Sequence, residues 1–328
     1  MSLLTYQERF SRVIVNLRQG RASPHKICML LAVLDLARSG ALVQNRIEFA
    51  PPLLERYAVF FDAVRGPSDH ANAYFPFFHL AGKLRGGQES FWHLYALPGR
   101  ELALGALSTA RSMADISDNV AYAELDGSLF DLLQHPAAID CVSDALARQW
   151  FDRGFQDLHA VVGRSGEISR YERQLRDGTR LLVTEVCPPA YVRSPAFRRL
   201  VMEIYDYRCA ATGLRLVLPP SGEAMVEAAH IHPFCEAGDD DPRNGLALTP
   251  NMHWAMDKNL IAPGPDYRWH VSKVVDDARI ADYQPLLAIK GQELLKPRER
   301  RMWPKQEVLA WRLDRLRDQT WTADQPSI

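Results

Sequence analysis

Four polar residues in the last third of the chain have the types and the spacing of a catalytic centre: His230, Asn244, His253 and Asp257. His253 and Asp257 are four residues apart in a short helical pattern, so both side chains would project from one face of a helix. An imidazole and a carboxylate suit Mg²⁺, Mn²⁺ or Zn²⁺, with open positions left for water and phosphate oxygens. His230 would then be free to act as a base, because imidazole titrates near neutral pH.

The elements predicted to position these residues are two strands, the loop between them and a helix. "MVEAAHIHPF" and "NGLALTP" have the pattern of short strands, "CEAGDDDPR" that of a loop, and "NMHWAMDKNL" the length of a short helix. The segment "RSPAFRRLVMEIYDYRCAATG" before them predicts a longer helix, with Ser194 as its cap and Pro195 at its first position. Each histidine alone is equally well explained as an ordinary strand or helix residue. The complete set, carried by two strands, their loop and the following helix, favours an active site.

The order of these residues resembles that of HNH endonucleases of the ββα-metal type, over about residues 190–265. The resemblance implies hydrolysis of a nucleic-acid phosphodiester. It implies that His230 is the general base, that His253 and Asp257 hold the divalent metal, and that Asn244 fixes the loop so that His230 points correctly.

Two positions depart from the family pattern. Many HNH enzymes have a metal-binding Asp or His directly before the base, where this chain has Ala229. Glu227 or His232 would compensate, and we expect strand alternation to place both on the face of His230. Many relatives also carry a zinc-binding CxxC pair, but Cys209 is followed three positions later by Thr212, so no structural zinc is expected.

The N-terminal half has a pattern of helices and aromatic segments. "SPHKICMLLAVLDLARSG" predicts a buried helix with Ser23 as its cap and Gly40 at its end, while "YFPFFHL" and "SFWHLYAL" predict strands or turn-flanked edges. Residues 125–155 have helical spacing, and a polar stretch with several glycines follows. We therefore predict domains at 1–158 and 191–328, the second with a C-terminal helical extension, joined by a linker at 159–190.

Residues 1–158 resemble the sulfur-recognising domain of McrA-like restriction endonucleases that cut phosphorothioate-modified DNA. The matching segments are "LRQGRASPHKICMLLAVLDL", "YFPFFHL", "SFWHL" and "LFDLLQHPAAIDCVSDALARQWF". Sulfur is larger and more weakly hydrated than oxygen, so an apolar notch beside cations would prefer it. The candidate DNA-binding residues are Arg18, His25, Lys26, Tyr74, Phe75, Pro76, Lys83, Arg85 and Arg100. Phe75 and Lys26 stand where relatives have Tyr and Arg. Lysine presents a single ammonium charge, whereas arginine presents a planar guanidinium that can form two parallel hydrogen bonds.

Together the two resemblances predict an α+β fold: an N-terminal mixed α/β DNA-recognition domain and a C-terminal ββα-metal HNH nuclease domain. The function they imply is a restriction-type endonuclease acting on double-stranded DNA, with a divalent metal, Mg²⁺ or Mn²⁺ first and Zn²⁺ as an alternative. Recognition of unmodified or otherwise modified DNA is one alternative, and a DNA-binding regulator that has lost activity is another. One active site per chain makes a homodimer plausible for cutting two strands.

Composition sets outer bounds on these hypotheses. With 328 residues and 47% hydrophobic content, the chain has enough apolar material for two cores. A formal net charge of −1 gives no overall attraction to nucleic acid, so binding would rely on local basic surface. The five cysteines are scattered, and the N-terminus has neither a signal-peptide pattern nor a membrane-length apolar run. We expect a cytoplasmic protein with no membrane partner.

Overall fold

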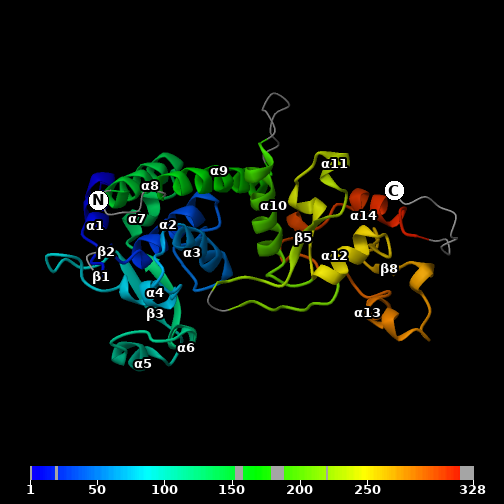
Figure 1. Ribbon diagram of the computed structural model, residues 1–328, viewed down its shortest axis with the longest axis horizontal. Coiled ribbons are helices and arrows are strands. Elements are labelled where there is room, and N and C mark those ends of the chain that lie inside the picture. Colours follow the sequence, from blue (N-terminus) through cyan, green and yellow to red (C-terminus); the bar gives the residue numbers. More distant parts are fainter. Residues whose placement is uncertain (1, 19–20, 152–157, 179–187, 219–220, 318–328) are drawn as a thin grey trace. The chain divides into compact units, whose positions relative to one another are not determined.

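The computed structural model describes residues 2–18, 21–151, 158–178, 188–218 and 221–317 (Figure 1). Two compact units compose it: Met1–Gln174 with Leu218–Glu223, and Leu175–Val217 with Ala224–Ile328. Each unit has its own core of buried apolar side chains. In the described ranges, the strands pair only into two-stranded antiparallel sheets, and no helix there is both long and apolar enough to cross a membrane. The mixed α and β architecture predicted from the sequence is confirmed.

The first unit is mainly helical. Its elements are α1 (Leu3–Ser11), β1 (Leu17–Arg18), β2 (Arg21–Ala22), α2 (His25–Arg38), α3 (Pro51–Val64), α4 (Tyr74–His79), β3 (Trp92–Ala96), α5 (Glu101–Ala106), α6 (Met113–Ser117), β4 (Val120–Leu125), α7 (Gly127–Leu132), α8 (Pro136–Phe151) and α9 (Leu158–Asp177). Helix α2 is the predicted core helix, and its residues from Ile27 to Arg38 are all buried, as expected for a helix that is apolar on every side. It ends before Gly40, whose φ of 73° suits glycine.

Two local predictions for this unit were wrong. Ser23 does not cap α2; Pro24 holds the cap position and the Ser23 hydroxyl pairs with Nδ1 of His25 at 2.8 Å. The segment "YFPFFHL" forms helix α4 where a strand or turn was predicted. Pro76 is the third residue of α4, and proline is tolerated in the first turn because an N–H there has no partner within the helix.

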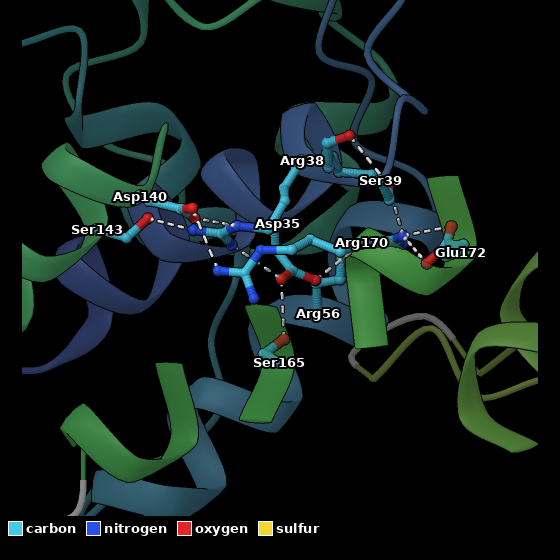
Figure 2. A network of polar contacts seen from close by, with 10 residues as sticks. Asp35, Arg38, Ser39, Arg56, Asp140, Ser143, Ser165, Arg170 and Glu172 are labelled. Atoms are coloured by element: carbon cyan, nitrogen blue, oxygen red, sulfur yellow. Dashed lines mark hydrogen bonds and ion pairs between the residues drawn. The ribbon is translucent and has the colours of Figure 1, made fainter. Parts of the chain in front are cut away.

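A buried polar network joins α2, α3, α8 and α9 (Figure 2). Nη2 of Arg56 donates to both carboxylate oxygens of Glu172 at 2.8 Å, and Nε of Arg56 lies 3.2 Å from Asp35. The Ser165 hydroxyl donates to Asp35 at 2.9 Å. Helix α9 covers most of the segment predicted as a linker, and its residues up to Gln174 belong to the first unit. Because these polar groups lie inside, α9 packs despite its hydrophilic sequence.

The second unit carries the four residues of the predicted catalytic centre. Its elements are α10 (Ala190–Ile204), β5 (Glu227–His230), α11 (Phe234–Ala237), η1 (Pro242–Asn244), β6 (Gly245–Leu248), α12 (Pro250–Asp257), β7 (Ile261–Pro263), β8 (Trp269–Val271), η2 (Lys273–Val275), η3 (Ala281–Tyr283), α13 (Gln284–Leu287), η4 (Arg300–Met302) and α14 (Gln306–Leu313). Helix α10 begins at Ala190, so Ser194 and Pro195 lie inside it and the predicted start was wrong. The buried Val192 in the added first turn explains why the helix extends upstream of the proline.

Candidate active site

The β5–β6 hairpin and helix α12 form the predicted strand, loop, strand and helix frame. The strands pair antiparallel, with His230 opposite Gly245 and Ala229 opposite Leu246. A Cβ atom on Gly245 would lie 2.5 Å from Cγ2 of Val201 on α10, so only glycine lets the hairpin approach that helix. The hairpin is thereby held against α10 at the strand end that carries His230.

His230 is held on two sides. Its ring stacks on Phe197 of α10, with 3.9 Å between ring centroids and 3° between the planes. Its Nε2 lies 2.9 Å from Oδ1 of Asp240, whose side chain is only 1% exposed. Nη1 of Arg193 contacts both oxygens of the same carboxylate at 2.9 Å. The sequence hypothesis identified His230 but neither Asp240 nor Arg193, because "DDD" has the composition of a solvated loop.

Asn244 is fully buried and satisfies the backbone of the loop between the strands. Its Oδ1 accepts the N–H of His232 at 2.8 Å, and its Nδ2 donates to the carbonyls of His232 and Asp239 at 2.9 and 3.0 Å. These three bonds tie the loop's two ends together next to His230. An apolar residue at this position would leave all three backbone groups without their partner.

His253 and Asp257 lie side by side on α12. Nε2 of His253 is 3.5 Å from Oδ2 of Asp257, and Nδ1 of His253 is 2.9 Å from Oε2 of Glu227 on β5. Glu227 thereby fixes the imidazole plane and directs Nε2 toward Asp257, as the outer carboxylate does for metal-ligating histidines. Two such atoms can both reach one ion at about 2.1 Å.

The donor chemistry of this pair fits a divalent cation with its remaining positions open to water or phosphate oxygens. Among the described residues, no group of three or more His, Cys, Asp or Glu side chains is arranged to hold a metal. Ala229, at the position where many HNH enzymes have a further ligand, is buried. Any ion at this site would therefore depend on His253 and Asp257 as its protein ligands.

Strand alternation separates Glu227 from His230, contrary to the sequence-based expectation. Residues an odd number apart on a strand point to opposite faces, so His230 faces α10 while Glu227 reaches His253 on α12. His232 follows the parity of His230, but its ring stacks on Trp311 of α14 at 3.8 Å. Of the two residues considered as substitutes for a ligand at Ala229, only Glu227 contacts the His253 side of the site.

The C-terminal helix α14 holds the strand end that carries His230. Arg312 is buried, and burial lowers the pKa of its guanidinium. It donates to the carbonyl of Ile231 at 2.6 Å and contacts the carbonyls of His230 and Met256 at 3.4 Å. Arg312 thus joins the end of β5 to the end of α12, a role no local motif near residue 312 indicates.

Asp241 anchors the acidic loop from the other side. Its carboxylate accepts hydrogen bonds from Arg243 at 2.6 Å and contacts Nζ of Lys305 at 2.8 Å. Burial acts to raise the pKa of Asp241, but the hydrogen bonds from Arg243 and Lys305 outweigh it and lower the pKa to about 2. The loop that supplies Asp240 to His230 is therefore tied to the C-terminal segment by charge.

Cys209, considered above for zinc, is buried against Thr249. The backbone N–H of Thr249 lies 3.5 Å from its sulfur, and the two side chains are 3.6 Å apart. Burial acts to raise the pKa of the thiol, but hydrogen bonds from Thr212 and Thr249 lower it below its ordinary value. Cys209 therefore packs in the hydrophobic core of the second unit.

In the first unit, His79 contacts Phe75 and Thr109 and lies within the electrostatic influence of Lys26. The rings of Phe75 and His79 lie 4.3 Å apart, and Nε2 of His79 is 2.8 Å from Oγ1 of Thr109. Burial lowers the pKa of His79, and the charge of Lys26 lowers it further. Burial also lowers the pKa of Lys26 itself. Phe75, and Tyr74 at the start of α4, are both partly exposed, and so is Lys26 on α2.

The other predicted DNA-binding residues lie elsewhere or are already engaged. Both ring nitrogens of His25 are paired, with Ser23 at 2.8 Å and the carbonyl of His70 at 2.9 Å, and Pro76 is buried. Lys83 faces Glu89 at 3.4 Å, Arg85 is exposed, and Nε of Arg100 donates to the carbonyl of Asp118 at 2.9 Å. Arg18 lies in β1, and its side chain is outside the described residues.

Comparison with known proteins identifies the class of the second unit. Residues 209–262 match the family model of HNH endonucleases, so the second unit contains an HNH domain. A solved structure described as a modification-dependent TagI restriction endonuclease is similar over 38% of this chain and 39% of that chain, with 20% identity and a TM-score of 0.30. The match thus spans well under half of that chain. No curated protein matches this chain.

Proposed function

We propose that this chain is a restriction-type DNA endonuclease that hydrolyses phosphodiester bonds with a His general base and a divalent metal. The observation that carries the proposal is the match of residues 209–262 to the HNH family model. His230 lies in β5 and His253 in α12, as expected, while Asn244 ends η1 directly before β6 instead of beginning the strand. HNH domains define a class of endonucleases. The buried contacts of Asn244 and the paired contacts of His253 support the assignment of each residue to that frame.

In the proposed reaction His230 accepts a proton from a water molecule whose oxygen attacks the phosphorus atom. The bond from phosphorus to the 3′ oxygen then breaks, leaving a 5′ phosphate and a 3′ hydroxyl that takes its proton from solvent. Asn244 keeps the loop closed so that the His230 ring stays aligned. His253 and Asp257 would hold a divalent ion, which when bound supplies positive charge for the phosphate and the leaving oxygen.

We further propose that the first unit recognises double-stranded DNA through a phosphorothioate linkage. Phe75 and Tyr74 offer partly exposed aromatic surface on α4, and the charge of half-buried Lys26 acts on His79, whose ring contacts Phe75. Sulfur on the backbone is less hydrated than oxygen, so apolar surface next to a cation favours it. Pro76 is buried, so Phe75 carries the apolar contact in this arrangement. Phe75→Ala should weaken binding to sulfur-containing duplex more than to plain duplex.

A cleavage assay on two matched duplexes, one with a single phosphorothioate, tests both parts. Each is incubated with Mn²⁺, with Mg²⁺ and with chelator, using wild type, His230→Ala and, as a control at a partly exposed position of the same unit, Asp277→Asn. Metal-dependent cutting of the sulfur duplex, abolished only in His230→Ala, supports the whole proposal. Cutting of both duplexes would leave the nuclease and remove sulfur recognition. Binding without cutting would favour an inactive regulator, the rival that Ala229 suggests.

Cutting of both strands by a protein with one such site per chain would be served by a homodimer. Sedimentation velocity of the protein with and without cleavable duplex measures that state directly. A shift from one to two chains on DNA would support pairing, and one chain per duplex with both strands cut would contradict it.

A further inference from the structure

A carboxylate to which the HNH pattern gives no role contacts the ring of His230. Asp240 follows β5 by ten residues, yet its side chain is almost completely buried against the His230 ring. The only ring contact of His230 with a charged group in the described residues is through Nε2, at 2.9 Å from Oδ1 of Asp240. Burial of a carboxylate is costly unless it is paired, and Asp240 is paired with both His230 and Arg193.

Arg193 on α10 is the second partner of this carboxylate. Its Nη1 lies 2.9 Å from both oxygens, and its guanidinium carbon is 3.4 Å from the centre of the Phe234 ring. An arginine placed between an aromatic ring and a carboxylate has little freedom to move. It fixes the orientation of the Asp240 oxygens toward His230.

The geometry sets the tautomer of the base. A carboxylate with a guanidinium on both oxygens accepts hydrogen bonds and has no proton to donate. The hydrogen atom in the contact between His230 and Asp240 therefore lies on Nε2, and Nδ1 keeps the lone pair of the neutral ring. Stacking on Phe197 fixes the plane of the ring, so that lone pair has one direction.

We propose that Asp240 is the positioning residue of the base, supported by Arg193, and that Nδ1 of His230 is the atom that takes the proton from water. This inference rests on the proposed nuclease function. As the water proton moves to Nδ1, its oxygen bonds to phosphorus and the bond to the 3′ oxygen breaks. The negative charge of Asp240 stabilises the imidazolium that forms, as the buried aspartate does in a Ser-His-Asp triad.

The tautomer is tested directly by long-range ¹H–¹⁵N NMR on wild-type protein labelled with ¹⁵N-histidine. The chain has ten histidines, and the signals of His230 are those lost in His230→Gln. In the neutral ring we expect the Nε2–H form. A wild-type spectrum showing the Nδ1–H form overturns the proposal. This measurement needs neither DNA nor metal, so it holds its meaning even if the chain proves not to cut DNA.

Kinetics of Asp240→Asn provide the second test. The amide can turn its N–H₂ group toward Nε2, which leaves the proton on Nδ1 and removes the base. With saturating metal we expect kcat on DNA to fall by about 10²-fold to 10⁴-fold while KM stays unchanged, the size of effect that a wrong tautomer has in a triad. Asp277→Asn, an Asp-to-Asn change at a partly exposed position of the same unit, should keep wild-type kcat.

The outcomes separate this inference from the function on which it rests. A wild-type protein that never cuts DNA overturns the nuclease, whatever the NMR result. A wild-type protein that cuts DNA, together with an Asp240→Asn variant of unchanged kcat, overturns the positioning role alone. If Asp240→Asn fails to fold, Arg193→Lys supplies the kinetic test: its lysine keeps the charge but not the planar contact, and an unchanged kcat would count against Arg193 as the support.

Discussion

Replacing Asp241 by Asn should weaken the loop that presents Asp240 to His230. The Asp241 carboxylate accepts the backbone N–H of Arg243 at 2.9 Å, bonds its guanidinium, and contacts Lys305 at 2.8 Å. Its side chain is 19% exposed, so solvent screens these interactions only in part. Asparagine keeps the shape and an acceptor oxygen but removes the charge that both cations contact.

The size of the effect follows from the pKa of Asp241, which falls from 3.8 to about 2 in the folded protein. At about 1.4 kcal/mol for each tenfold change in proton affinity, the ionised group contributes about 2 kcal/mol to the free energy of unfolding at pH 7. Because the folded pKa is depressed, this contribution is complete above about pH 4 and disappears as the pH falls toward 2. By pH 3 about half of it should be gone.

Urea denaturation of wild type and Asp241→Asn at pH 7 and at pH 3 measures this difference. Hydrogen exchange of peptides containing β6 shows whether the loss belongs to the second unit. The matched control is Asp277→Asn, because Asp277 also bonds an arginine two residues on, at 2.7 Å, but its side chain is 34% exposed and no lysine of the described residues pairs with it. It should lose far less. An equal loss in both variants, or a loss in Asp241→Asn that does not shrink at pH 3, would refute the reasoning.

Three further predictions concern single side chains. Glu227→Gln should weaken Mn²⁺ binding by about 10-fold to 100-fold in calorimetric titration, because the residue that orients His253 loses its charge; unchanged affinity would separate Glu227 from the metal site. Glu172→Gln removes the charged partner of Nη2 of buried Arg56, whose Nε still faces Asp35, and should lower the free energy of unfolding of the first unit by about 3 kcal/mol in denaturant titration. An unchanged free energy would contradict the importance of the network in Figure 2. Because the pKa of His79 is depressed in the folded protein, the unfolded chain binds a proton at this residue first, and stability should fall as pH drops below about 6.5. His79→Asn should make the decrease in Tm between about pH 7.5 and pH 5 smaller. An unchanged decrease would exclude His79 as its source.

Sequence patterns predicted elements best where the buried face is apolar. Helix α2 and the β5–β6 hairpin have that pattern, and both form where expected. Helix α9 departs from this rule because its inward face carries Ser165 and Glu172, whose partners lie on α2 and α3. These polar side chains are buried with hydrogen-bond and ion-pair partners from other helices. The hydropathy of a single segment does not show such partners.

The residues of the candidate site also fall into those that local sequence spacing predicts and those that only tertiary packing brings together. His253 and Asp257 have a fixed spacing on one helix, so their juxtaposition follows from the helical repeat alone. Asp240 and Arg193 are 47 residues apart, and only the packing of α10 on the hairpin brings them together. Residues that contact reacting atoms can be found from a local motif. The residues that orient them come from distant segments, and their signals are ordinary surface-like charges.

Because His230 and Glu227 lie on opposite faces of β5, the hairpin determines how His230 is placed relative to His253. His230 is aligned by Phe197 of α10 and by Asp240, while His253 on α12 is aligned by Glu227 of β5. In the proposed reaction a scissile phosphate would have to meet both sets, so their relative position would depend on the β5–β6 pairing. Arg312 bonds to carbonyls at the end of β5 and of α12 together, which fixes that position from outside the motif. The geometry of catalysis would then depend on the C-terminal helix as much as on the HNH residues themselves.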